Sequence, residues 1–178
     1  MEIWTIGHST HSLEQFVALL RDAGIEALAD VRTLPKSRRN PHFARESLER
    51  ELPARGFRYR HIKRLGGWRK VQPGSPNGGW EEGAFQGYAD HTATAEFRAG
   101  LDELEELARR APTAVMCAEA LWWRCHRRLI ADQLRVRGWR VLHIAPNGEQ
   151  TEHELTPFAV VDGELITYPP RQGRLIDP

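Results

Sequence analysis

The 178-residue sequence contains only two cysteines, Cys117 and Cys125, and no long hydrophobic run. Two cysteines this close together do not make the disulfide framework of a small secreted protein. No apolar N-terminal segment predicts a signal peptide or a membrane span, so we expect a protein of the reducing cytoplasm with no membrane partner. Internal repeats and low-complexity segments are also missing. The length favours one domain over residues 1–178.

Three common ligand-binding motifs are missing as well. Gly7 follows the first predicted strand, but it belongs to neither a G-x-G-x-x-G motif nor a P-loop, so no dinucleotide cofactor is indicated. Phosphatase and rhodanese loops place an arginine six residues after the reactive cysteine. Here Trp123 and Ala131 occupy the positions six residues after the two cysteines, which disfavours a phosphatase.

The net charge of +1 conceals an uneven distribution of charge. The segment 32–70 holds thirteen Lys or Arg residues and only three acidic residues. Such an asymmetry favours a surface that faces an anionic partner, either a small molecule or nucleic acid. The same arginines could instead merely solvate a surface helix and loop, and the sequence leaves that alternative open. Nothing in the sequence indicates the oligomeric state.

Segments of strand and helix character alternate along the chain. Strands are predicted at 2–6, 25–31, 57–62, 113–116 and 139–144, with helices at 12–23, around 48–55, around 97–107 and at 127–137. We therefore expect a three-layer α/β fold, a mostly parallel sheet of about five strands with helices on both faces. A long loop is predicted from Gly66 to Gly83, and a short C-terminal hairpin over about 154–168, around the turn signal Asp162-Gly163.

Side chains that could act in catalysis or ligand binding follow the ends of the predicted strands. In chain order they are His8 and Ser9, Asp30 and Arg32, His61, Cys117 and Glu119, and His143. The carboxyl ends of parallel strands share one edge, where open α/β sheets bind ligands, so we predict an enzyme-like pocket there. If the first and fourth strands are neighbours, His8 and Ser9 face Cys117 and Glu119. His91 and His153 are expected at the surface and receive no role.

The segment from Thr113 to Ala131 holds both cysteines and is the centre of the predicted pocket. A strand that leads into a helix places thiols near unpaired N–H groups and positive charge, and these favour the thiolate. The sequence therefore indicates a cysteine-dependent enzyme, in which Cys125 or Cys117 is the thiolate and His126 or Glu119 moves protons. Cysteines that are simply buried and inert are the alternative.

Basic and polar side chains are predicted to hold an anionic ligand in this pocket, either a phosphate-bearing molecule or a nucleic acid. These residues are His8, Ser9, Asp30, Arg32, Ser37, Arg38 and Arg127. The substrate and the reaction are not determined by the sequence.

Two other functions stay open. The basic segment 32–70, with its interleaved aromatic residues, could form a non-catalytic nucleic-acid-binding module. Cys117, Cys125, His126 and His8 could instead bind zinc or iron. Cys-x7-Cys-His is not a zinc-knuckle interval, however, so no cofactor is predicted from the spacing.

Several sequence blocks, in this order, allow a comparison with a known family. They are Thr5-Ile6-Gly7-His8-Ser9, Asp30-Val31-Arg32 with Pro35 and Ser37, Leu65-Gly66-Gly67, Phe85-Gln86-Gly87-Tyr88-Ala89, and Met116-Cys117-Ala118-Glu119 through Cys125-His126-Arg127. Over about residues 1–145 the chain resembles the uncharacterised domain of unknown function family 488. The resemblance implies no particular reaction, but its motifs fall on the strand ends named above. Trp122 and Trp123 depart from the family pattern and could form a stacking platform or a hydrophobic lid.

Overall fold

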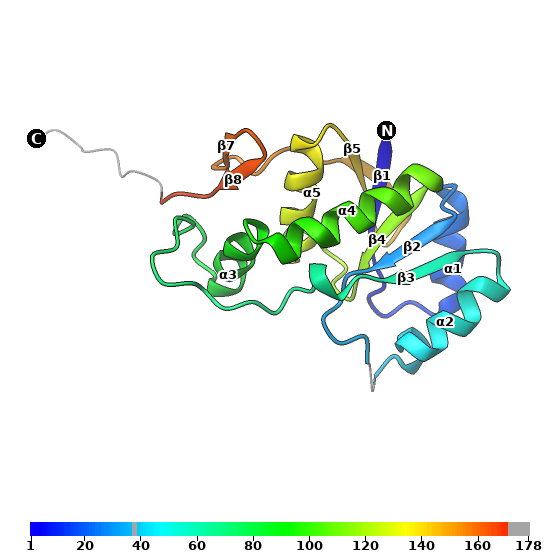
Figure 1. Cartoon of the computed structure of the whole chain (residues 1–178). Helices are drawn as coiled ribbons and strands as arrows, with labels where there is room; N and C mark the ends of the chain where they lie inside the picture. The colour runs from blue at the N-terminus through cyan, green and yellow to red at the C-terminus, as the bar shows by residue number, and fades with distance from the viewer. Residues whose placement is uncertain (37–38, 171–178) are drawn as a thin grey trace, which may run out of the picture.

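The computed structural model describes residues 1–36 and 39–170 (Figure 1). Six strands form its main sheet in the order β3-β2-β4-β1-β5-β6. They are β1 (Glu2–Gly7), β2 (Ala27–Asp30), β3 (Arg58–His61), β4 (Thr113–Cys117), β5 (Arg140–Ile144) and β6 (Gln150–Glu152). The first five are parallel, which confirms the predicted α/β sheet. The short strand β6 pairs antiparallel with β5 and adds a sixth strand that was not predicted.

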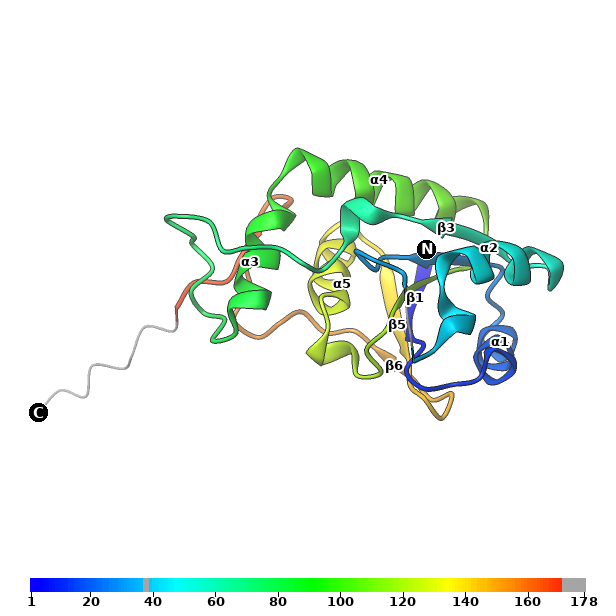
Figure 2. The same ribbon diagram turned by 90° about the horizontal axis from the view of Figure 1, so that it is seen from below.

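Helices cover both faces of the sheet, as the alternating pattern predicts (Figures 1 and 2). The helices α1 (Leu13–Asp22) and α2 (Arg45–Ala54) cover one face, and α4 (Ala95–Arg110) and α5 (Arg127–Val136) cover the other. Successive side chains of a strand point to opposite faces, so Leu28 packs in the core under α1 and α2, whereas Ala29 packs in the core under α4 and α5.

Local sequence signals set the ends of α1. The N–H of Gln15 donates to the Ser12 hydroxyl at 3.1 Å, and the Gln15 side chain accepts from the Ser12 N–H at 3.0 Å. This capping box satisfies two N–H groups that a helix start leaves without partners. At the other end, Gly24 adopts a φ of +69°, which stops the helix before β2 as predicted.

The strands β1 and β4 lie side by side at the centre of the sheet, with Gly7 opposite Cys117. Their outgoing connections run along opposite faces, because β1 leads through α1 to β2 while β4 leads through α5 to β5. Right-handed crossovers in opposite directions require this arrangement. The two loops therefore diverge after the strand ends, and this is the switch point at which open α/β sheets bind ligands.

Segments beyond the sheet complete the structure. The helix α3 (Gly83–Thr92) follows the predicted long loop but was not itself predicted. Strands β7 (Val160–Asp162) and β8 (Leu165–Thr167) form the predicted hairpin, and the N–H of Tyr168 after it donates to Asn77 Oδ1 at 2.9 Å. Short 3₁₀ helices lie at η1 (Pro41–Phe43), η2 (Lys63–Leu65) and η3 (Trp122–Arg124). Within the described ranges, none of the helices combines the length and apolar character needed to cross a membrane.

Candidate functional site

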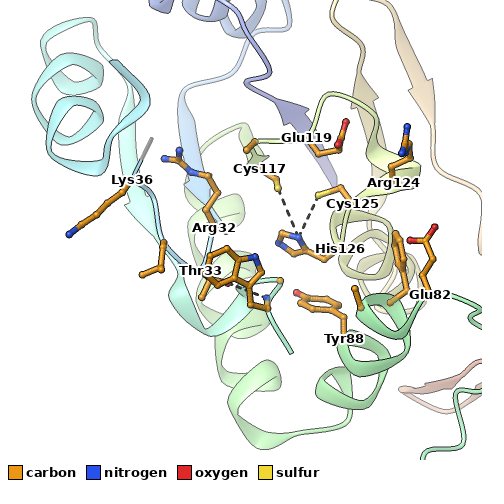
Figure 3. A pocket seen from close by; sticks show the side chains of 16 residues that line it. Arg32, Thr33, Lys36, Glu82, Tyr88, Cys117, Glu119, Arg124, Cys125 and His126 are labelled. Carbon is orange, nitrogen blue, oxygen red and sulfur yellow. Dashed lines mark hydrogen bonds between the residues drawn. The ribbon is translucent and has the colours of Figure 1, made fainter. Parts of the chain in front are cut away.

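Two thiols and one imidazole meet where β4 ends and α5 begins. Cys117 is the last residue of β4, and Cys125 and His126 directly precede α5. His126 Nδ1 lies 3.5 Å from the sulfur of Cys125 and 4.0 Å from that of Cys117, and the three atoms all lie within 4.8 Å of one another. Both thiols are free, and Figure 3 shows them directed at the imidazole ring. We call these three residues the Cys–Cys–His cluster.

A main-chain carbonyl fixes the proton of the His126 ring. His126 Nε2 lies 3.1 Å from the carbonyl oxygen of Val31. A carbonyl oxygen can only accept, so Nε2 carries the hydrogen, and Nδ1 of the neutral ring keeps its lone pair. That lone pair faces the two sulfur atoms. The ring can therefore accept a proton from a thiol or donate an electron pair to another acceptor.

The two thiols have different acidities. Burial raises the pKa of Cys125, but a hydrogen bond from Cys117 and the charge and N–H groups of Arg127 outweigh it, so the pKa lies well below the ordinary value. The hydrogen bond to Cys125 and burial raise the pKa of Cys117. The geometry thus favours a thiolate at Cys125 and a neutral thiol at Cys117, in agreement with the expected effect of a helix start.

Two glycines permit the close approach of loops around the cluster. A Cβ on Gly7 would lie 2.0 Å from the carbonyl oxygen of Glu119, so only glycine lets the loop after β4 pass the end of β1. A Cβ on Gly67 would lie 2.5 Å from His126 Nδ1. Both glycines belong to blocks that the sequence singled out, and their shared role is space rather than a special φ.

A buried ion pair fixes Arg32 beside the cluster. Arg32 Nε and an NH2 nitrogen donate to the two oxygens of Asp30 at 2.9 and 2.6 Å, and NH2 also donates to the Phe43 carbonyl at 2.8 Å. Asp30 is fully buried and also accepts from the Tyr59 hydroxyl at 2.7 Å. Burial lowers the pKa of Arg32, but hydrogen bonds and charge from Asp30 outweigh it and raise the pKa overall. The guanidinium is therefore a fixed, permanent positive charge.

His8 and Ser9 continue the site past the end of β1. The N–H groups of His8 and Ser9 donate to the carbonyls of Cys117 and Ala118, both at 3.0 Å. His8 Nε2 accepts from Arg32 at 3.3 Å, and burial together with the Arg32 charge lowers the pKa of His8 to about 4. The ring is therefore neutral near pH 7. Ser9 has a φ of +48°, a left-handed conformation that non-glycine residues adopt mainly at special sites.

Two adjoining pockets open at this edge of the sheet. One, of about 430 Å³, contains the Cys–Cys–His cluster, and the other, of about 500 Å³, lies over His8 and Ser9. They share Arg32, Leu34, Lys36, Ala118 and Glu119. A ligand that spans the two pockets could therefore contact the cluster and these shared residues at the same time.

A family model described as a domain of unknown function, DUF488, matches residues 12–134. The chain belongs to the DUF488 family. The match is shorter than the expected range of about 1–145. Searches of curated proteins and of solved structures found no match to the chain.

The site of this DUF488 protein brings together most of the predicted residues. Cys117, Cys125, His126, Glu119 and Arg32 line the first pocket, and His8 and Ser9 line the second. Asp30 lies behind Arg32 as its partner rather than facing a ligand. Glu119 is exposed, with one carboxylate oxygen accepting from the Leu121 N–H at 3.2 Å. Ser37 and Arg38 lie outside the described residues.

Arg127 does not line either pocket, although the sequence indicates a ligand-binding role for it. Its side chain is fully buried, and it donates to the carbonyl oxygens of Glu119 and Ala120 and to the hydroxyl of Thr5. The guanidinium thus holds the loop that follows β4. Its influence on the pocket is indirect, through the position of this loop and the charge it places near Cys125.

His143, predicted at the pocket edge of the sheet, and His153, predicted at the surface, are both buried and line neither pocket. The ring centroids of His143 and Trp122 lie 4.0 Å apart in a parallel stack. The two ring nitrogens of His143 form hydrogen bonds with the Thr5 hydroxyl and with His153. His153 in turn contacts the fully buried Asp132 at 2.9 Å. The surface prediction for His153 is therefore wrong, as is that for the buried His91. Trp122 packs on this buried network, which explains one of the two unusual tryptophans.

Several pocket residues were not predicted as site residues. They are Thr33, Leu34, Lys36, Trp68, Glu82, Ala84, Phe85, Tyr88, Ala118 and Arg124 in the first pocket. Tyr88 is fully buried, with its ring 5.0 Å from that of His126, and Trp68 is 75% exposed at the pocket. The Phe85 to Ala89 block carried a signal for Tyr88. Lys36 lies in the basic loop, but no pattern distinguishes it there from its charged neighbours.

The basic segment 32–70 is partly neutralised by acidic partners. Arg60 pairs with Glu103, Arg69 with Glu96, and Arg45 with Glu49. Such pairs leave less positive charge for a nucleic acid than the sequence count indicates. Lys36 and Arg32, by contrast, line both pockets.

Proposed function

We propose that this DUF488 protein is an enzyme that binds an anionic, phosphate-bearing substrate at the carboxyl edge of its sheet and uses Cys125 as an activated thiolate. One observation carries the proposal: the Cys–Cys–His cluster and Arg32, which a buried ion pair holds in place, line the same pocket. A buried inert cysteine needs no cation, no oriented imidazole and no cavity beside it.

Each group has a role that follows from its surroundings. Arg32, locked by Asp30, binds the anionic group, and the exposed Lys36 adds a second positive charge. Cys125 supplies the electron pair because Arg127 and the helix start favour its thiolate. The unprotonated Nδ1 of His126 takes a proton from either thiol when the pair must deprotonate.

The proposed covalent step is a nucleophilic attack. The sulfur of Cys125 donates its electron pair to an electrophilic atom of the substrate, and the leaving group departs with the electrons of the bond that breaks. No electrons are gained or lost overall. The leaving group is protonated by solvent, or by the His126 imidazolium if the ring has first taken the proton of the Cys125 thiol.

The thiol chemistry also bears on the cellular compartment. A thiolate beside a second thiol within 4.8 Å is easily oxidised, so the proposed activity needs a reducing environment. We therefore propose that the protein acts in the cytoplasm.

Alkylation of the reduced, chelator-treated protein tests the proposal. At pH 7 iodoacetamide should label Cys125 faster than Cys117. The variants Cys117→Ser and Cys125→Ser each keep one of the two thiols, so they give the two labelling rates separately. Inorganic phosphate should slow the labelling of Cys125 by occupying the pocket. Equal labelling rates for the two thiols, or labelling that phosphate does not change, would contradict the proposal.

Two lysine variants make the experiment specific. Lys36 and Lys63 are both exposed residues of the basic segment, but only Lys36 lines the pockets. Lys36→Gln should weaken the protection by phosphate, whereas the matched control Lys63→Gln should leave it unchanged. A similar loss in both variants would indicate that phosphate acts through general screening.

A further inference from the structure

We infer that Cys117 Sγ, Cys125 Sγ and His126 Nδ1 form a three-ligand site for a divalent ion that prefers sulfur, with Zn²⁺ as the expected occupant and an open fourth position in the pocket. The inference deepens the proposed function, on which it rests only for the anionic substrate that would meet the open position. The metal site itself depends on the positions of the ligand atoms.

The distances between the ligand atoms fit a tetrahedral ion. Zn–S bonds of about 2.3 Å and Zn–N bonds of about 2.0–2.1 Å put a sulfur and a nitrogen ligand about 3.6 Å apart at a tetrahedral angle. The observed separations from His126 Nδ1 are 3.5 Å to Cys125 and 4.0 Å to Cys117. All three atoms lie within 4.8 Å, so small side-chain rotations bring them to bonding distance.

The imidazole is already oriented as a ligand. Histidines that bind metals usually donate their second ring N–H to a carbonyl or carboxylate, which fixes the ring and its tautomer. The carbonyl of Val31 does this for His126 at 3.1 Å. Gly67 leaves the space beside Nδ1 free of any Cβ. The ligand atom is thus unprotonated, directed at the sulfurs and accessible.

The charges in the cluster also favour an ion. As thiolates, the two sulfurs would bring two negative charges within 4.8 Å of each other. A divalent cation bound between them would balance these charges and keep both sulfurs deprotonated. With three protein ligands and a pocket on the fourth side, the site has the composition of a catalytic rather than a structural zinc site.

Other residues of the same pocket could assist a reaction at the fourth position. Arg32 and Glu119 line the same pocket as the three ligands. Arg32 could hold the anionic group of a substrate, and the exposed carboxylate of Glu119 could accept a proton from a bound water.

Spectroscopic titration of the full chain with Co²⁺ tests the inference. Reduced, chelator-treated protein under nitrogen should bind one equivalent of Co²⁺ and develop a thiolate-to-cobalt charge-transfer band with the visible bands of tetrahedral Co²⁺. One equivalent of Zn²⁺ should then abolish these bands. Absence of stoichiometric binding, or binding without the charge-transfer band, would overturn the inference.

Variants locate the ion. Cys117→Ser, Cys125→Ser and His126→Gln should each weaken Zn²⁺ binding by more than about 100-fold, because loss of an outer partner alone costs about 10- to 100-fold. His42→Gln, a histidine outside both pockets, is the matched control and should bind normally. Unchanged affinity in Cys125→Ser would overturn the inference.

Gly67→Ala keeps all three ligands and therefore separates metal binding from the loss of a thiol. Its Cβ would lie 2.5 Å from His126 Nδ1, so Zn²⁺ affinity should fall although both cysteines remain. Circular dichroism checks that each variant is folded. Protection of Cys125 by phosphate is measured separately, in chelator-treated protein. If the metal site fails its test, the proposed anion pocket is therefore not refuted, and if the anion pocket fails, the metal site is not refuted.

Discussion

The substitution Asp30→Asn should strongly destabilise the protein, because it removes one charge from a buried pair. Asp30 is 0% and Arg32 is 7% exposed, and the carboxylate accepts from Arg32 Nε, NH2 and N–H and from the Tyr59 hydroxyl. An amide can accept at one oxygen only, and its NH₂ group would face one of these donors. Arg32 would keep its charge in a buried place without a counterion.

Breaking a buried ion pair from one side costs about 3–5 kcal/mol of unfolding free energy. In a chain of this size each kcal/mol lowers the melting temperature by about 2–4 °C, so Asp30→Asn should lose about 6–20 °C. Urea and thermal unfolding followed by circular dichroism measure both quantities.

A surface pair supplies the matched control for this substitution. Arg45 and Glu49 form a similar ion pair at the surface, with 49% and 45% of their side chains exposed. Glu49→Gln should cost less than about 0.5 kcal/mol, because water screens an exposed i, i+4 pair. If Asp30→Asn cost no more than Glu49→Gln, the argument that Asp30 fixes Arg32 would be refuted.

Two further predictions concern the loop at the cluster and the buried histidines. Gly7→Ala places a Cβ 2.0 Å from the Glu119 carbonyl, so it should destabilise the fold by about 1–3 kcal/mol and slow the alkylation of Cys125, whereas Gly163→Ala in the hairpin should leave that alkylation rate unchanged. Burial lowers the pKa of His8 to about 4 and that of His143 to about 2, both below the ordinary 6.5, so the unfolded chain binds more protons than the folded chain below pH 6.5. The contribution of the two histidines to the unfolding free energy should therefore be complete above pH 6.5. Toward pH 4 it should fall by about 1.4 kcal/mol per pH unit for each histidine. Urea titrations at several pH values measure this, and an unfolding free energy that stays constant between pH 7 and 5 would contradict the assignment.

The sheet and its helices were predictable because their signals are local and repeated. The Ser12 cap, the apolar face of α1 and Gly24 predict that helix almost residue by residue, and the apolar run before Cys117 predicts β4. The site edge followed from topology, since parallel strands must bring their carboxyl ends together. The helix α3 and the strand β6 were missed, because a helix with three buried polar residues and an exposed three-residue strand carry no clear periodicity.

Side-chain direction was the part of the site that the sequence could not supply. Arg32 and Arg127 are both arginines beside reactive residues, yet one lines the pocket and the other is buried among main-chain carbonyls. The contact of His126 with Val31 joins residues 95 positions apart, and only the fold reveals it. His153 lies in a polar stretch of sequence but meets the buried Asp132, so its burial depends on a distant partner.

The most direct test of the anion pocket compares two alkylating reagents at Cys125. Iodoacetate is anionic and iodoacetamide is neutral, and they have the same reactive carbon and leaving group. We define the ratio as the rate with iodoacetate divided by the rate with iodoacetamide. At Cys125, in chelator-treated protein at low salt, this ratio should exceed that of free cysteine. It should fall in Lys36→Gln and in Arg32→Lys. A ratio equal to that of free cysteine, unchanged by either variant, would contradict the account of Arg32 and Lys36 as the anion-binding side of a thiolate site.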